Sequence, residues 1–206
     1  MDRREFFRNG FHEVSKAAVK AADAHCSDTA SRWIRPPYAL VELEFLLACT
    51  RCDKCTGVCP YQVIFPLPLR SGVQVAGTPA MDLQNKACHL CEDWPCVAVC
   101  EPRALQRPQP PAGKAVPLPL LAIASINTGT CLPYNGPECG ACAACCPVSG
   151  ALTWEMGKPR IDPGYCCGCA ICREQCIADP KAIELRSVHK QNESTTRDRS
   201  CNLHDV

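Results

Sequence analysis

The stretch CTRCDKCTGVCP, residues 49–60, contains four cysteines at a fixed spacing and ends in proline. Two residues separate each of the first three cysteines, and three residues separate the third from the fourth. Three thiolates at this spacing can wrap a short loop around one face of a compact inorganic group, while the fourth begins a departing helical turn. Neighbours at this spacing have poor Cα and Cβ geometry for disulfides with one another. The stretch therefore predicts a set of metal ligands.

The same spacing returns in CCGCAICREQC, residues 166–176. The C-x2-C-x2-C-x3-C spacing, followed by proline as in residues 49–60, binds 4Fe-4S clusters in bacterial ferredoxins. A structural zinc site usually has two C-x2-C pairs separated by a longer insert instead. The repeat favours iron–sulfur clusters over both zinc and a disulfide framework, although 20 cysteines in 206 residues would allow either of those on density alone.

Two further groups vary the spacing. CHLCEDWPCVAVCEP, residues 88–102, has two extra residues between its second and third ligands. CGACAACCP, residues 139–147, can be read in two registers, one through Cys145 and one through Cys146. Each of the other groups ends in C-x3-C, and only the register through Cys146 keeps that ending. In this register Cys131, separated from the stretch by seven residues, supplies the missing ligand.

Sixteen cysteines are thus predicted to bind four 4Fe-4S clusters: Cys49, Cys52, Cys55, Cys59, Cys88, Cys91, Cys96, Cys100, Cys131, Cys139, Cys142, Cys146, Cys166, Cys169, Cys172 and Cys176. The four spare cysteines are Cys26, Cys145, Cys167 and Cys201. Because Cys145 and Cys167 each adjoin a ligand, we expect them to be small buried side chains beside a cluster. We expect exposed thiols at Cys26 and Cys201.

The clusters can be paired in two ways. In two-cluster ferredoxins the fourth cysteine of each run ligates the other cluster. This crossing predicts site one (Cys49, Cys52, Cys55 and Cys100), site two (Cys88, Cys91, Cys96 and Cys59), site three (Cys131, Cys139, Cys142 and Cys176) and site four (Cys166, Cys169, Cys172 and Cys146). A nested pairing, of the first group with the fourth and the second with the third, remains open and uses the same sixteen ligands.

The fold class predicted is α+β: two tandem ferredoxin-like modules, each with two 4Fe-4S clusters, rich in loops and stabilised by their cofactors. Strand-like segments at 61–65, 150–154 and 181–185 follow three of the cysteine groups, with a helical turn expected after each C-x3-C. The apolar stretch 115–126 predicts a proline-led strand. Without its cysteines the chain has too little aliphatic core to offset its ordering entropy, so folding should depend on the clusters.

Composition divides the chain into five segments. An amphipathic helix is predicted in residues 1–30, with Phe and Ala side chains at spacings of three and four. The first module is expected at 31–106 and the second at 120–187. A proline-rich linker, residues 107–119, joins them, and a polar tail at 188–206 is expected to be disordered.

The N-terminal stretch MDRREFFRNG resembles a twin-arginine export signal. However, charged residues such as Glu13, Lys16 and Lys20 interrupt the segment that should be an unbroken apolar stretch. We therefore expect a cytoplasmic protein, with twin-arginine export to the periplasm as the alternative. No run of 18 apolar residues occurs in the sequence, so no transmembrane segment is predicted.

With these groups placed, the chain resembles the ferredoxin-type proteins of the NapF, NapG and MauM kind, over residues 33 to about 186. The matching motifs are IRPPYALVELEFLLACTRCDKC, AGTPAMDL, CHLCEDWPC and CLPYNGPECGACAACCP. The resemblance implies up to four 4Fe-4S clusters and a role in electron transfer or maturation beside a redox enzyme. It also supports the register through Cys146. The chain departs from exported members by lacking an apolar leader, and Glu101 separates Cys100 from its proline.

We expect an electron carrier that relays single electrons to or from a partner redox enzyme or a membrane quinol-linked partner, with the N-terminal helix as a docking surface. The alternative is an accessory protein for cluster loading or assembly of a molybdenum-type reductase. No nucleophile–base pair or nucleotide loop suggests an enzyme, and no basic run suggests nucleic-acid binding. Basic residues near the ligands, including Arg51, Lys54 and Arg173, are expected to compensate cluster charge or contact a partner.

Overall fold

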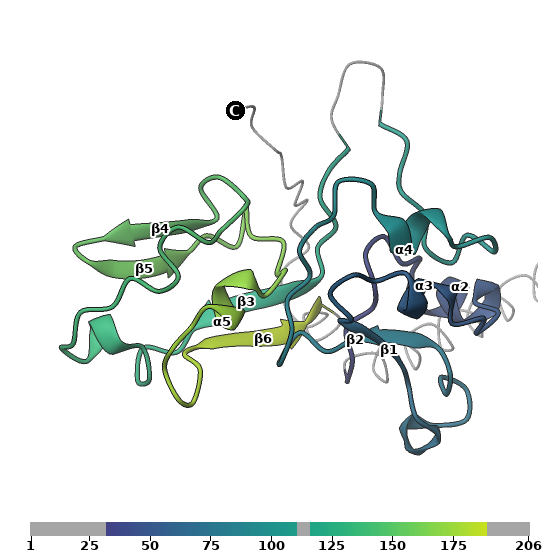
Figure 1. The fold of residues 1–206 in the computed structure, drawn as a ribbon, viewed down its shortest axis with the longest axis horizontal. Helices are drawn as coiled ribbons and strands as arrows, with labels where there is room; N and C mark the ends of the chain where they lie inside the picture. Colours follow the sequence, from purple (N-terminus) through teal and green to yellow (C-terminus); the bar gives the residue numbers. More distant parts are fainter. Residues whose placement is uncertain (1–31, 111–115, 189–206) are drawn as a thin grey trace, which may run out of the picture.

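The computed structural model describes residues 32–110 and 116–188 of the chain. The predicted N-terminal helix, most of the predicted tail, Cys26 and Cys201 lie outside these residues. Within them the fold consists of long loops joined by short helices and small antiparallel sheets (Figure 1). The expectation of a loop-rich α+β chain is confirmed at this level.

The N-terminal half of the described chain contains one two-turn helix and two single-turn helices. These are α2 (Glu42–Ala48), α3 (Lys54–Gly57) and α4 (Pro95–Ala98). Strands β1 (Ile64–Pro66) and β2 (Pro79–Met81) pair antiparallel, and the 3-10 turn η1 (Leu69–Ser71) lies in the connection between them. The strand predicted at 61–65 is therefore present, but it begins three residues later.

The C-terminal half contains two antiparallel pairs. Strand β3 (Ala122–Ile126) pairs with β6 (Ile183–Ser187), and β4 (Leu152–Glu155) pairs with β5 (Lys158–Ile161). The 3-10 turn η2 (Leu132–Tyr134) and helix α5 (Ile171–Glu174) complete this half. Three of its strands fall on the segments predicted from the apolar stretch at 115–126, from 150–154 and from 181–185, while β5 was not predicted.

The turn between β4 and β5 explains the missed strand. Its two residues, Met156 and Gly157, both have positive φ, 48° and 74°. Such a two-residue turn matches the twist of the flanking strands and closes a tight hairpin. Met156 is an unusual residue for this conformation, which favours Gly, Asn and Asp, so the sequence carries only half of the usual hairpin signal.

The prediction that a helical turn follows each C-x3-C is wrong. Helices α3, α4 and α5 each begin one residue before the third cysteine of their group, contain it, and end before the fourth. The residue before each helix, Asp53, Trp94 or Ala170, has a positive φ of 61°, 47° or 73°. This left-handed residue reverses the chain, so the turn forms inside the motif rather than after it.

One apolar cluster extends from Ile34 to Leu185 and includes residues of both halves. Cysteines of all the motif groups except the third are among its buried members. The third group contributes Cys146 at its edge and Cys142 to a smaller cluster beneath β4 and β5. The cysteine loops are therefore part of the core, as expected for a chain that is poor in aliphatic residues.

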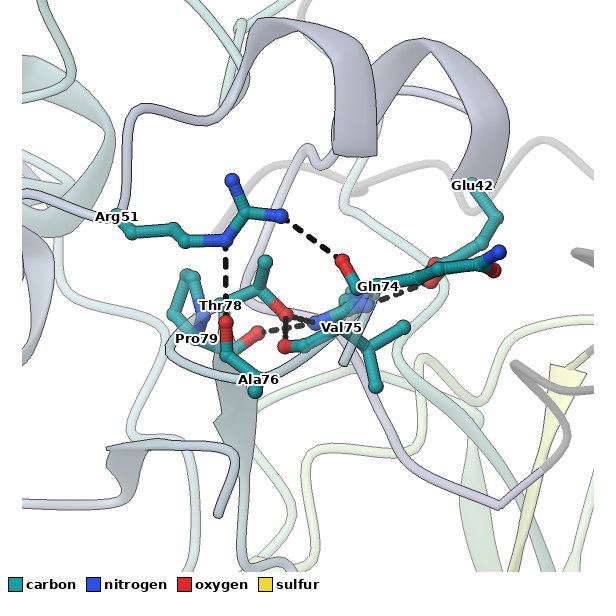
Figure 2. A network of polar contacts seen from close by, with 8 residues as sticks. Glu42, Arg51, Gln74, Val75, Ala76, Thr78 and Pro79 are labelled. Carbon is teal, nitrogen blue, oxygen red and sulfur yellow. Dashed lines mark hydrogen bonds and ion pairs between the residues drawn. The ribbon is translucent and has the colours of Figure 1, made fainter. Parts of the chain in front are cut away.

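A buried ion pair fixes the helix that leads into the first cysteine loop. Arg35 donates from Nε to Glu42 Oε2 (2.9 Å) and from Nη2 to Glu42 Oε1 (2.5 Å), and their side chains are 6% and 1% exposed. Arg35 also donates to Thr78 Oγ1 and to the Pro79 carbonyl. Figure 2 shows this network joining α2 to the loop before β2. Because every donor and acceptor of the pair is satisfied, the charges can be buried there.

No helix among the described residues is long and apolar enough to cross a bilayer.

Candidate iron–sulfur sites

Three of the four cysteine loops share one backbone design. The third cysteine of each, Cys55, Cys96 or Cys172, is the second residue of a single-turn helix and is buried. The amide of each fourth cysteine then donates to a carbonyl three residues earlier, at 3.3 Å for Cys59, 3.0 Å for Cys100 and 3.1 Å for Cys176. The shared sequence spacing thus produces a shared geometry.

The third group is built differently. Cys131 caps the 3-10 turn η2, and its amide donates to the Asn127 carbonyl at 3.0 Å. A turn closed by the amide of Ala143 and the carbonyl of Gly140 (2.9 Å) surrounds Cys142 where the other groups have a helix. The seven-residue spacer therefore replaces the usual C-x2-C turn with η2.

Site one is the most accessible of the four. Cys55 is buried, whereas Cys52 is exposed. Burial, and after it the charges of Cys49, Cys100 and Cys52, raise the pKa of Cys55 to about 11. The amide of Lys54 hydrogen-bonds the exposed thiol and lowers the pKa of Cys52. Cys49, Cys52 and Cys100 therefore lie within electrostatic range of Cys55.

Two basic residues brace the loop of site one. Arg51 donates from Nε to the Ala76 carbonyl (3.0 Å) and from Nη2 to the Gln74 carbonyl (2.8 Å), as Figure 2 shows. Lys54 Nζ donates to Glu101 Oε1 at 2.5 Å, which links the first cysteine group to the second. Arg51 and Lys54 therefore hold the loop of site one in place. The sequence analysis expected them to compensate cluster charge or to contact a partner and did not predict this structural role.

Site two surrounds an apolar cavity. Its empty volume is about 350 Å³ when the solvent at its open side is included. All four predicted ligands line it: Cys59, Cys88, Cys91 and Cys96. Burial raises the pKa values of Cys88 and Cys96 to about 12. Trp94 is buried in the cavity wall and shields the site from water.

Aromatic rings also cover site two. Tyr61 stacks on His89 with 3.8 Å between ring centroids and 10° between planes. Both rings line the cavity. His89 Nε2 lies 3.3 Å from Glu174 Oε2. His89 is thus held between the Tyr61 ring and the Glu174 carboxylate.

Site three surrounds a cavity with about 390 Å³ of empty space, counted in the same way. It is lined by its four predicted cysteines: Cys131, Cys139, Cys142 and Cys176. Burial raises the pKa of Cys142 to about 11. Trp154 of β4 also lines this cavity, and its buried indole N–H has no hydrogen-bond partner among the described protein atoms. An acceptor in the cavity, such as a cluster sulfide, would satisfy that donor.

Site four surrounds a third cavity, with about 360 Å³ of empty space. The four predicted ligands Cys146, Cys166, Cys169 and Cys172 line it together with the spare Cys167. Burial raises the pKa of Cys172. Cys169 differs, because a hydrogen bond from the Cys167 thiol lowers its pKa to about 7. The loop is held against β3 by the amide of Leu121, which donates to the Cys167 carbonyl at 2.8 Å.

The spare cysteines of the described chain lie beside the sites, as predicted. Cys167 is buried, and Cys145 is half-buried with its thiol donating to the Cys142 carbonyl at 3.3 Å. The charges of Cys146 and Cys169 raise the pKa of Cys145 after the larger effect of burial, so Cys145 lies near site four as well as near Cys142 of site three. Every cysteine in the described residues is free of disulfides.

Three of the four crossed sets of cysteines each line one cavity. The cavities of sites two, three and four each combine three cysteines of one group with the fourth cysteine of its neighbour. The nested pairing, first group with fourth and second with third, does not match these cavities. An apolar cavity lined by four thiols suits an iron–sulfur cluster, whose usual protein ligands are four thiolates. Among residues 32–110 and 116–188, no group of three or more His, Cys, Asp or Glu side chains is close enough together to hold a single metal ion.

Sequence comparison supplies the family. A methylamine utilization ferredoxin-type protein MauM of Methylophilus methylotrophus is 32% identical over 89% of this chain and 86% of its own length. The chain belongs to the MauM and NapG family of ferredoxin-type proteins. The ferredoxin-type protein NapG of Escherichia coli is 33% identical over 74% of this chain and 69% of its own length. Membership in this family indicates an iron–sulfur electron carrier in general terms, rather than a catalytic enzyme.

NapF is also related to this chain. The ferredoxin-type protein NapF of Escherichia coli is 27% identical over 78% of this chain and 90% of its own length. No protein-family model matches the chain, and no solved structure matches it. The resemblance inferred from the cysteine motifs is confirmed by these relatives.

Proposed function

We propose that this chain relays single electrons through four 4Fe-4S clusters held at sites one to four. The observation that carries the proposal is the set of three cavities, each lined by the four cysteines of one predicted site. When bound, each cluster would supply a centre that accepts and releases one electron. Membership in a ferredoxin-type family supports the same general role.

The chain's own side chains hold the sites and limit the access of water. The buried cysteine in each single-turn helix anchors its loop, and Trp94 closes the wall of site two. Buried donors without partners among the described atoms, Trp154 Nε1 at site three and Thr56 Oγ1 beside Cys55, are available to sulfur acceptors. Hydrogen bonds to sulfur and exclusion of water are the means by which a protein sets cluster potentials.

The proposed architecture is two tandem ferredoxin-like modules at 31–106 and 120–187, joined by the proline-rich segment 107–119. Exchange of the fourth cysteine within each pair of groups supports this division, because it ties sites one and two together and sites three and four together.

A redox enzyme is the proposed partner, with a membrane quinol-linked protein as the other candidate. Site one suits electron exchange with a partner because Cys52 is exposed. The hydrophobic side chains of Leu47 and Val58, on either side of this loop, are exposed too. A docked protein could cover these side chains and approach the site.

The exposure of Cys52 also favours a second candidate function, an accessory protein that loads clusters into a molybdenum-type reductase. An accessible ligand is easier for an acceptor protein to replace than a buried one. Transfer of iron and sulfide from the loaded chain to an apo-ferredoxin would separate the two functions. An electron carrier should retain its clusters through many cycles of reduction and oxidation.

The test of the proposed function is anaerobic reconstitution of the full chain, followed by iron, sulfide and zinc analysis and a reductive titration monitored by EPR. We expect four clusters per chain, each taking up one electron reversibly. Bound zinc, or fewer than two clusters per chain, would contradict the proposal.

The compartment is a separate proposal. The charged residues Glu13, Lys16 and Lys20 follow the arginine pair too closely for an unbroken apolar export segment, which favours the cytoplasm. Fractionation of cells that express the tagged chain tests this, and a periplasmic pool would instead support twin-arginine export.

A further inference from the structure

The two halves of the chain meet at sites two and four. The amide of Cys88 donates to the carbonyl oxygen of Cys169 at 2.9 Å, and both residues are buried. Cys88 is the first predicted ligand of site two, and Cys169 is the second predicted ligand of site four. The charge of Cys169 also contributes to the raised pKa of Cys88, after the larger effect of burial. Two predicted ligands of different sites are therefore joined by one hydrogen bond.

Polar contacts from Glu174 on α5 hold this junction on both sides of Cys88. The amide of Ala87 donates to Glu174 Oε1 at 3.2 Å, and His89 Nε2 lies 3.3 Å from Glu174 Oε2. Glu174 thus contacts the residue before Cys88 and the residue after it. The neighbouring Arg173 donates from Nε to the Gln84 carbonyl at 3.0 Å. The position of the site-two loop against α5 is set by these contacts.

Within each half the remaining sites also adjoin. Lys54 Nζ in the loop of site one donates to Glu101 Oε1, which follows Cys100 of the second group, at 2.5 Å. Cys142 of site three and Cys172 of site four belong to one apolar cluster. In Figure 1, helices α2 and α3 lie at one end of the molecule and the β4–β5 hairpin, which lines site three, lies at the other.

We propose that the hydrogen bond between Cys88 and Cys169 is the electronic junction between the two halves, so that the sites are ordered one, two, four, three. Sites one and three then form the two ends, where electrons enter and leave. Glu174 is a positioning residue for the junction. The covalent path from each sulfur runs through its own Cα to this hydrogen bond, so the link between the sites is short and buried. The inference rests on the proposed function, because it requires clusters at these sites.

The experiment measures magnetic interaction between reduced clusters in the loaded full-length chain, by low-temperature EPR after partial reduction with dithionite. Two variants each remove one site: Cys166→Ala for site four and Cys131→Ala for site three. Magnetic coupling between a reduced cluster in one half and a reduced cluster in the other should split their EPR signals. We expect loss of site four to abolish this splitting between the halves, and loss of site three to preserve it. Preservation of this splitting without site four, or its loss without site three, would overturn the proposed order.

A second variant covers the case in which removal of a site prevents folding. Glu174→Ala leaves all sixteen predicted ligands in place, and Glu155→Ala, at an exposed carboxylate of β4, is its matched control. We expect weaker splitting between the halves in Glu174→Ala at unchanged iron content, and no change in Glu155→Ala. Unchanged splitting in Glu174→Ala would remove its positioning role. A wild-type chain that binds no clusters would instead refute the proposed function itself.

Discussion

Replacing Glu42 with glutamine should destabilise the loaded protein and release site one first. The carboxylate lies opposite Arg35, with contacts of 2.9 and 2.5 Å, and the Glu42 side chain is only 1% exposed. Glu42→Gln keeps the shape of the side chain but leaves the Arg35 charge buried without a counter-charge. Helix α2 ends at Ala48, and Cys49 caps it with its amide bonded to the Phe45 carbonyl. A shift of this helix would therefore displace the first ligand.

The size of the effect follows from the burial of the pair. Breaking a buried ion pair by removing one partner costs about 3–5 kcal/mol. With a urea dependence of about 1–3 kcal/mol per molar, the lower figure shifts an unfolding midpoint by about 1–3 M. The assay is anaerobic urea titration of the loaded chain, monitored by its visible cluster absorbance and by circular dichroism.

The matched control is Glu44→Gln, because Glu44 is exposed on the same helix. An exposed substitution of this kind should change stability by no more than about 0.5 kcal/mol. A midpoint for Glu42→Gln equal to that of Glu44→Gln would refute the view that the buried pair fixes α2 and site one.

Four further outcomes are expected. A Cβ at Gly168 (φ 72°) would lie 1.9 Å from the backbone oxygen of Ala122, so Gly168→Ala should lose site four in iron analysis. Gly157→Ala, at φ 74° with open space around it, is the control and should lower the free energy of unfolding by only about 1–2 kcal/mol in urea titration. Cys145→Ser should leave four clusters in place and Cys131→Ser should lose or convert one; the reverse result, by EPR and iron content, would restore the other register of the third group. Trp154→Phe should make the potential of site three more negative, because a hydrogen-bond donor to sulfur is lost, and an unchanged redox titration would remove that role. Removing the clusters with a chelator and an oxidant should abolish cooperative unfolding by circular dichroism, and a stable apo fold would contradict the cofactor-dependent core.

The cysteine spacing predicted the four groups but left two pairings of those groups open, and three cavities match the crossed one. The choice of Cys146 over Cys145 rested on the C-x3-C ending, on Cys131 as the missing ligand and on the family resemblance, and the structure places Cys146 in the wall of the site-four cavity. Crossing of the fourth cysteine between groups was predicted from the same repeat. Local spacing succeeds here because each loop must place its thiols around one compact group.

The helical turns were misplaced for a backbone reason. Asp53, Trp94 and Ala170 adopt positive φ immediately before the helices, and none of them is glycine. Left-handed backbone at a tryptophan or an alanine has no clear sequence signal. Because the chain reverses at these residues, each helix forms inside its motif, whereas the sequence had predicted a helical turn after the fourth cysteine.

Long-range contacts were beyond the reach of sequence patterns. Arg35 and Glu42 have residue types that are rarely fully buried, so nothing in their sequence indicates an internal pair. The junction of Cys88 with Cys169 joins residues from different motifs, and its support by Glu174 depends on how the halves pack. Only the three-dimensional structure brings these residues together.

The most direct measurement of the central claim is native mass spectrometry of the full-length chain after anaerobic reconstitution. The mass should exceed that of the apo chain by four 4Fe-4S clusters, with a ladder of single-cluster losses under activation. A limiting mass with two clusters or fewer, or with zinc ions in their place, would contradict the assignment of sixteen cysteines to four iron–sulfur sites.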